Sequence, residues 1–162
     1  MKTLTIFRHA KSSWEFPELT DHDRPLNRRG ERDAPAMAER LKDAGIRPSL
    51  IIGSPAVRAW QTARIIAKQI GYPVEFLHRE PGLYHAGVNK LLDVIAAQDD
   101  GFNSIMIVGH NPGLTDLANE LVPGVTSNIP TAGYVAILID CNNWDLRSRK
   151  SARLRHYDYP KR

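Results

Sequence analysis

The chain has 162 residues, of which 42% are hydrophobic and 25% are charged; its formal net charge is +4, and its single cysteine is Cys141. These values are typical of one globular domain, so we expect residues 1–162 to form a single domain, and a lone thiol excludes an internal disulfide. No apolar stretch approaches the ~20 residues of a membrane helix, and the N-terminus lacks the apolar core of an export signal, so we expect a cytoplasmic protein with no membrane partner.

Two apolar runs and a helical pattern between them begin the chain. Thr3 to Phe7 and Ser49 to Gly53 are rich in β-forming residues and predict buried strands. Between these runs, apolar residues recur at helical spacing from Ala34 to Leu41. Gly45 and Pro48 mark the end of this predicted helix.

A second helix and a short strand are predicted next. Ser54-Pro55 is typical of a helix start, because serine can cap the first turn and the N–H that proline lacks would have no partner there. The apolar stripe that follows ends at Gly71. Val74 to Leu77 then predicts a third strand, and Val88 to Ile95 predicts a third helix.

The second half of the chain continues this alternation. Ser104 to Val108 is apolar enough for a central strand, and Asn111-Pro112 repeats the cap-then-proline helix start. Tyr134 to Ile139 predicts a fifth strand, and Ser151 to Tyr157 predicts a sixth strand at an edge. The alternation predicts an α/β fold, namely a three-layer α/β/α arrangement with a mostly parallel central sheet of five or six strands.

The C-terminal segment holds much of the excess positive charge. From residue 147 onward Asp158 is the one acidic residue, against the basic residues Arg147, Arg149, Lys150, Arg153, Arg155, Lys161 and Arg162. A patch for an acidic protein or a nucleic acid is one interpretation. A solvated edge strand and tail is the favoured one, because no RNA-binding signature accompanies the charge, so we do not expect a nucleic-acid partner.

Three of the predicted strands end in residues suited to phosphate chemistry. Arg8-His9 follows the first strand, Arg58 lies shortly after the second, and His110 follows the fourth. In an open α/β sheet the carboxyl ends of parallel strands meet at one crevice, where ligands bind. We therefore expect these four side chains to line one pocket.

The chemistry of these residue types points to phosphoryl transfer. The arginine fork binds pairs of phosphate oxygens, so Arg8 and Arg58 are candidates for phosphate binding, and Arg58 gains from a helix N-terminus. His9 is the candidate nucleophile, with its second ring nitrogen held by a backbone carbonyl. His110, if protonated, would add a donor to the transition-state oxygens.

Local geometry sets a condition on this pocket. Successive strand residues point to opposite faces, so Arg8 and His9 can share a pocket only if the chain has left the strand by residue 8. Two long irregular segments, Lys11 to Arg28 and Val122 to Ala132, follow site segments, and we expect them to form the rim.

Other polar residues fit plainer roles. Asp21-His22-Asp23 could suggest a metal site, but its spacing matches no ligand pair, so a solvated loop is favoured and no metal site is expected. His78 and His85 could line the rim, although surface positions are favoured. Trp14 and Tyr84 could contact a substrate, although aromatic residues more often serve packing.

At this point the residues resemble a known family. Leu4 to Ala10, containing Arg8-His9, resembles the Arg-His-Gly signature of the histidine phosphatase (phosphoglycerate mutase-like) superfamily. Ser54 to Ala63 is similar to its second motif, and Val108 to Pro112 is similar to its third. Ala10 in place of glycine, the Lys11 to Trp14 segment and the short chain indicate the SixA-like branch, the phosphohistidine phosphatases.

The resemblance implies a phosphoglycerate mutase-like fold and a site that needs neither metal nor cofactor. It implies that His9 is the phosphorylated nucleophile and that Arg8, Arg58 and His110 bind the phosphate. Many members also carry a glutamate acid after the third strand. Glu80 stands near that position and is the candidate acid, although Pro81 follows it and the surrounding pattern differs.

The favoured function is a metal-independent phosphatase that acts on a phosphohistidine of a protein. The segment Glu80 to Gly87 is too short to cover a substrate, so the site is expected to be open, which suits a protein side chain and disfavours a mutase. A small-molecule phosphomonoesterase of the same superfamily and a non-catalytic phosphoprotein-binding module are the alternatives. The oligomeric state is not predicted.

Overall fold

The computed structural model describes residues 1–162 and contains one six-stranded sheet in the order β3-β2-β4-β1-β5-β6. The strands are β1 (Lys2–Arg8), β2 (Leu50–Gly53), β3 (His78–Arg79), β4 (Ser104–Gly109), β5 (Tyr134–Asp140) and β6 (Ser151–Asp158). The helices are α1 (Arg28–Asp43), α2 (Val57–Ile70), α3 (Val88–Ala96) and α4 (Gly113–Leu121), with short 3-10 helices η1 (Asp21–Asp23), η2 (Val74–Phe76), η3 (Pro81–Leu83) and η4 (Leu146–Ser148). None of the helices is both long enough and apolar enough to cross a membrane.

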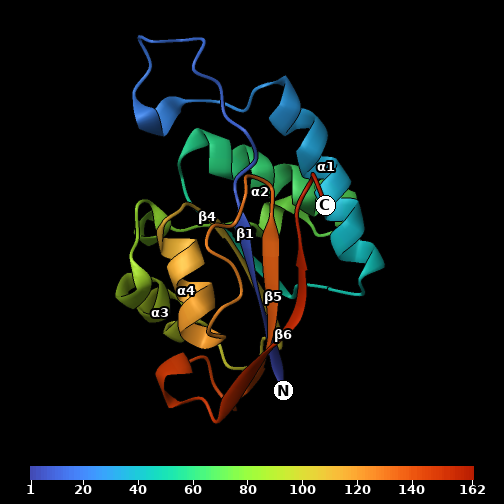
Figure 1. The fold of residues 1–162 in the computed structure, drawn as a ribbon, viewed down its shortest axis with the longest axis vertical. Helices are drawn as coiled ribbons and strands as arrows, with labels where there is room; N and C mark the ends of the chain where they lie inside the picture. Colours follow the sequence, from blue (N-terminus) through green and yellow to red (C-terminus); the bar gives the residue numbers. More distant parts are fainter.

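Alternate side chains of β1 face two different helix pairs. Leu4 and Ile6 are fully buried in a core shared with α3 and α4, whereas Phe7 packs in a second core with α1 and α2. The pleat accounts for this division, because neighbouring strand residues point to opposite faces. Figure 1 shows the helix pairs on the two sides of the sheet, so the predicted three-layer α/β/α fold is confirmed.

One strand of the sheet, β5, runs opposite to the other five. The pairings of β1 with β4, of β4 with β2 and of β2 with β3 are parallel, whereas β5 is antiparallel to both β1 and β6. After α4 the chain returns to the carboxyl end of β1, where Arg8 N donates to Gly133 O (3.0 Å) and Ala132 N donates to His9 O (3.1 Å). Because β5 starts there, it runs opposite to β1.

The strand predicted at Val74 to Leu77 is wrong. Residues 74–76 form η2, and β3 follows with only two residues at the sheet edge. The Tyr72 hydroxyl accepts a hydrogen bond from Ile51 N (3.4 Å) and donates one to Phe76 O (3.2 Å). The edge of β2 is therefore occupied at Ile51, and pairing with β3 begins one residue later, at Ile52 with His78.

Candidate active site

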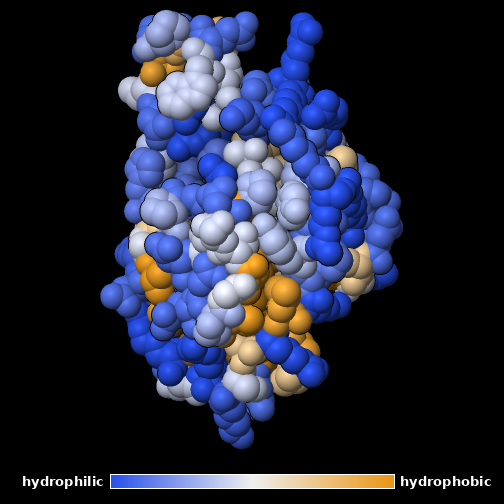
Figure 2. Space-filling model, viewed as in Figure 1, coloured by the Kyte–Doolittle hydropathy of each residue, from blue (hydrophilic) through white to orange (hydrophobic).

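The four residues singled out in the sequence lie around one cavity of about 290 Å³ at the carboxyl ends of β1, β2 and β4. The cavity is lined by Arg8, His9, Lys11, Ser12, Trp14, Arg24, Arg58, His85, His110, Asn111 and Thr131. Residues from the 11–28 and 122–132 segments thus contribute to its wall, and the first of these segments projects beyond the sheet in Figure 1. The same end of the molecule is mainly hydrophilic in Figure 2, whose largest hydrophobic area lies over β5 and β6.

His9 presents an unprotonated nitrogen to this cavity. Its Nδ1 lies 2.8 Å from Ala10 O, to which it donates as the neutral imidazole, and its Nε2 accepts from Arg58 Nε at 3.4 Å. Burial lowers the pKa of His9 to about 3; the Ala10 carbonyl opposes this shift, and nearby guanidinium charges add to it. The ring is therefore neutral at pH 7, with its lone pair on the cavity side.

Arg8 and His9 share the cavity although Arg8 is still the last residue of β1, so the condition that the chain leaves the strand by residue 8 is wrong: it leaves after residue 8. His9 N still donates to Gly109 O (3.0 Å), but Ala10 N donates to the Thr62 hydroxyl (3.0 Å), so the chain turns toward α2 at this point. Arg8 Nη1 donates to Ile129 O (2.9 Å), and its Nε is buried without a hydrogen-bond partner.

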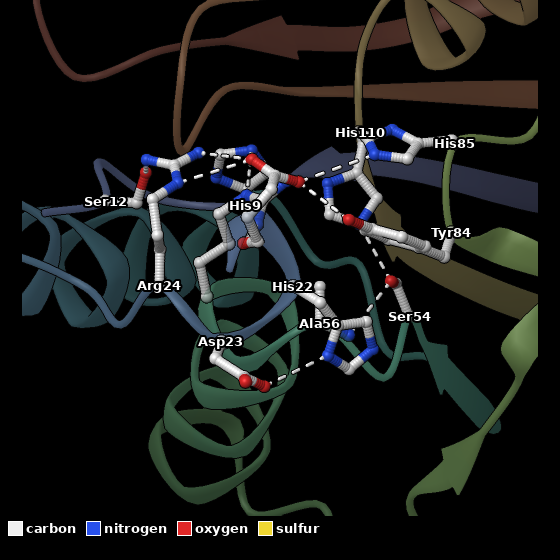
Figure 3. Close-up of polar contacts among 12 residues, drawn as sticks. His9, Ser12, His22, Asp23, Arg24, Ser54, Ala56, Tyr84, His85 and His110 are labelled. Carbon is white, nitrogen blue, oxygen red and sulfur yellow. Dashed lines mark hydrogen bonds and ion pairs between the residues drawn. The ribbon is translucent and has the colours of Figure 1, made fainter. Parts of the chain in front are cut away.

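Ser54 contacts His110 and does not cap α2. The predicted helix start at Ser54-Pro55 is wrong, because α2 begins at Val57 and Ser54 Oγ accepts from Ala56 N (3.3 Å). His110 Nε2 lies 2.8 Å from the Ser54 hydroxyl (Figure 3), and when that hydroxyl donates, the proton of the neutral ring is on Nδ1. That Nδ1 is buried without a partner.

His110 is a neutral donor in this setting. Burial lowers its pKa to about 3, and the positive charge of Arg58 acts in the same direction. Its ring centroid lies 5.2 Å from that of His9. A donor role for His110 therefore comes from the neutral ring with Nδ1–H, in place of the protonated ring considered from the sequence.

Asp21 contacts the site through Arg58, a role that the sequence did not indicate, although its side chain is 43% exposed, as expected for a solvated segment. Arg58 donates to it twice, from Nη1 to the backbone oxygen (2.6 Å) and from Nη2 to Oδ2 (3.0 Å). The Tyr84 hydroxyl also donates to Oδ2, at 2.7 Å. Burial would raise the pKa of Asp21, but the Tyr84 hydrogen bond and the Arg58 charge outweigh it and hold the pKa well below its ordinary value. His22 and Asp23 pair with each other.

Arg24 is a second site residue that the sequence did not predict. It is 8% exposed, donates to the Ser12 hydroxyl (2.7 Å) and to Asp21 Oδ1 (3.1 Å), and stacks with its guanidinium 3.6 Å from the centroid of the Trp14 ring. Its only sequence signal is its place in a long loop next to the first motif. The cavity therefore gathers three guanidinium groups and is suited to bind an anion. No cluster of metal-ligating side chains is present.

The structure does not bring Glu80 to the cavity. Pro81 starts η3, and Glu80 Oε1 accepts from Gly82 N (3.1 Å) at the start of this helix, while Oε2 lies 3.6 Å from His78 Nε2. Glu80 lines a separate surface cavity near α3. His85, five residues later, takes a place in the wall of the main cavity.

Replacing Glu80 with glutamine is expected to leave turnover within about twofold of wild type, because its carboxylate contacts none of the site residues. Steady-state kinetics on an alkyl phosphate ester, whose leaving group needs a proton, checks this expectation. A loss of about 100-fold or more on that ester would instead make Glu80 the acid.

The depressed pKa of the buried imidazoles has a consequence for stability. Protons bind His9 and His110 in the unfolded chain near pH 6.5, but in the folded chain only near pH 3, so the free energy of unfolding should fall as the pH drops through this range. Urea titrations between pH 7 and pH 4 should show a larger loss for wild type than for His9→Ala. Equal losses would contradict the neutral, buried state of His9.

The sequence is similar to those of known proteins. The profile of the histidine phosphatase superfamily (branch 1) matches residues 4–80. An uncharacterized chloroplastic protein of Arabidopsis thaliana is 31% identical over 152 residues, covering 89% of this chain and 69% of its own, and an uncharacterized Mycobacterium leprae protein is 30% identical over 166 residues, covering 95% and 99%.

Solved structures extend the likeness. A candidate phosphohistidine phosphatase SixA from Agrobacterium tumefaciens superposes with a TM-score of 0.83 at 27% identity and covers 98% of each chain. The protein histidine phosphatase SixA in complex with tungstate has a TM-score of 0.79 at 22% identity, covering 96% of this chain and 95% of its own, and so supports the fold alone.

Proposed function

The chain belongs to the histidine phosphatase superfamily and is SixA-like, and from this premise we propose that it is a metal-independent phosphatase working through a phosphohistidine intermediate on His9. We propose a phosphohistidine on a protein as its favoured substrate. The observation that carries the proposal is His9 Nε2, an unprotonated nitrogen held among guanidinium groups in an anion-binding cavity.

The proposed reaction has two displacements at phosphorus. In the first, His9 Nε2 forms a bond to phosphorus while the bond from phosphorus to the leaving group breaks and the leaving group takes up a proton. The hydrogen bond from Nδ1 to Ala10 O stabilises the charge that develops on the ring. In the second, water attacks phosphorus, the bond to Nε2 breaks, and inorganic phosphate leaves.

The unpartnered donors of the cavity are suited to the phosphoryl oxygens. Arg8 Nε and His110 Nδ1 are both buried without a hydrogen-bond partner. Arg58 Nε donates toward His9 Nε2, where phosphorus would bind. The two terminal nitrogens of Arg58 donate to Asp21, which fixes the orientation of the guanidinium. Fixed donors aimed at developing charge are a large source of rate acceleration.

The open mouth of the cavity supports a protein substrate. Trp14 in its wall is 74% exposed, and the His85 side chain is 59% exposed. The segment between β3 and α3 is short and lies at the wall of the cavity instead of across it. A phosphorylated side chain on a folded partner could therefore reach His9 without a lid opening.

A substrate panel with a metal chelator present tests the proposed function. It compares a phosphohistidine carrier protein with sugar and nucleotide phosphates. We expect turnover in chelator and the highest kcat/KM on the carrier protein. Loss of turnover in chelator would refute metal independence, and a preference for a small phosphoester would make the protein a phosphomonoesterase. Tight binding of the carrier without turnover would indicate a phosphoprotein-binding module.

A further inference from the structure

The proposed first displacement needs a proton for the leaving group, and His85 stands where such a proton could be supplied. It follows η3 and lines the same cavity as His9 and Arg58. Its ring centroid lies 5.8 Å from that of His110 and 4.0 Å from that of Tyr84. Figure 3 shows the ring beside His110. Because the side chain is 59% exposed, an incoming leaving group can reach it.

A carboxylate partners the His85 ring. Nε2 of His85 lies 3.4 Å from Asp21 Oδ2, the oxygen that also accepts from Tyr84 and Arg58. A carboxylate beside an imidazole orients the ring and stabilises its protonated form, as in hydrolases that pair the two groups. Asp21 is itself fixed by Arg58, so the pair has a defined position relative to His9.

The backbone at His85 adopts a conformation that few side chains take. Its φ is +55°, and Ala132 is the one other residue besides glycine with a positive φ. His85 lines the cavity, and Ala132 follows Thr131 of the cavity wall and donates from its N to His9 O. A left-handed residue costs free energy unless its surroundings fix it, and such residues cluster at functional sites.

The other groups around the cavity are poor proton donors for a leaving group. His9 and His110 are buried with lowered pKa and are unprotonated at pH 7, and the lowered pKa of Asp21 keeps its carboxylate ionised. Lysine and arginine side chains hold their protons too tightly to release them near neutral pH. Glu80 lies outside the cavity. Imidazole is the group that both gives and takes a proton in this range.

We propose that His85, oriented by Asp21, is the acid–base residue of this site. The inference rests on the proposed function. In the first displacement, the His85 imidazolium transfers its proton to the leaving oxygen or nitrogen while the bond from phosphorus to His9 Nε2 forms. In the second, neutral His85 takes a proton from the attacking water while phosphorus separates from Nε2. His85 ends protonated, as it began.

A pair of esters that differ in their leaving groups tests this assignment. Phenyl phosphate needs a proton as its bond breaks, whereas the nitrophenolate of 4-nitrophenyl phosphate leaves readily without one. His85→Asn removes the titratable group and tolerates the left-handed backbone. It should lower kcat/KM about 100-fold or more on phenyl phosphate and less than about threefold on the nitrophenyl ester. His78→Asn is the matched control, an exposed imidazole beside Glu80 outside the cavity, and should change neither value.

The outcomes separate this inference from the proposed function. An equal loss on both esters would overturn the acid and indicate a positioning role, and no loss on either ester would also overturn it. Wild-type turnover of the carrier protein but of neither ester would refute the acid while the proposed function stands. Wild type that hydrolyses nothing would refute the proposed function, and the acid assignment with it.

Discussion

Replacing His9 with alanine should lower turnover by at least about 10³-fold, to the limit of detection, because the substitution removes the atom that attacks phosphorus. The neighbouring ring of His110, with its centroid 5.2 Å from that of His9, is not placed to substitute for it. His110 Nε2 is held by the Ser54 hydroxyl, 2.8 Å away. Stopped-time assays on the preferred substrate of the panel measure the loss.

The control for this variant is His156→Ala. His156 lies on β6, its ring stacks near Tyr134, and it is absent from the cavity wall. It should retain wild-type turnover, and both variants should keep the wild-type circular dichroism spectrum. More than about one tenth of wild-type activity in His9→Ala would contradict nucleophilic catalysis by His9.

Arg58→Ala is expected to have the next largest effect, a loss of about 10²–10³-fold in kcat/KM. Arg58 is 3% exposed and its guanidinium lies against His9 Nε2, so its removal takes away a fixed positive charge next to the attacking nitrogen. It also releases Asp21 from its two hydrogen bonds to this fork. Arg58→Lys should recover only part of the loss, because an ammonium cannot reproduce the planar fork.

The matched control, Arg64, lies further along the same helix. Arg64 is exposed on α2 and lines a different cavity, between α1 and α2. Arg64→Ala should leave kcat/KM within about twofold of wild type. If Arg58→Ala and Arg64→Ala reduced activity alike, the loss would reflect general surface charge, and Arg58 would not be a phosphate-binding residue.

The layered fold was predictable because apolar runs and helical stripes alternate clearly along the chain. Parallel pairing then places Arg8, His9, Arg58 and His110 at the same edge of the sheet. The strand expected at Val74 to Leu77 could not be corrected from its pattern. The residue that prevents pairing there is Tyr72, which lies outside the segment and whose hydroxyl accepts from the backbone N–H of Ile51 in β2.

The loop residues of the site could not be predicted from the sequence, because an irregular segment has no periodic pattern that shows where its side chains point. Asp21 reads as polar loop, yet it binds Arg58, 37 residues away in the chain. Ser54 reads as a helix cap, yet its hydroxyl contacts His110, 56 residues away. Glu80 matched the family position roughly, but the proline after it turned its carboxylate to cap η3.

The central claim is that a phosphoryl group resides on His9 during turnover. Rapid quenching with labelled substrate, followed by peptide mapping, locates that group. One acid-labile, alkali-stable phosphoryl group per chain on His9, absent from His9→Ala, is the expected result. Turnover with no label on the chain, or with label on a residue other than His9, would contradict it.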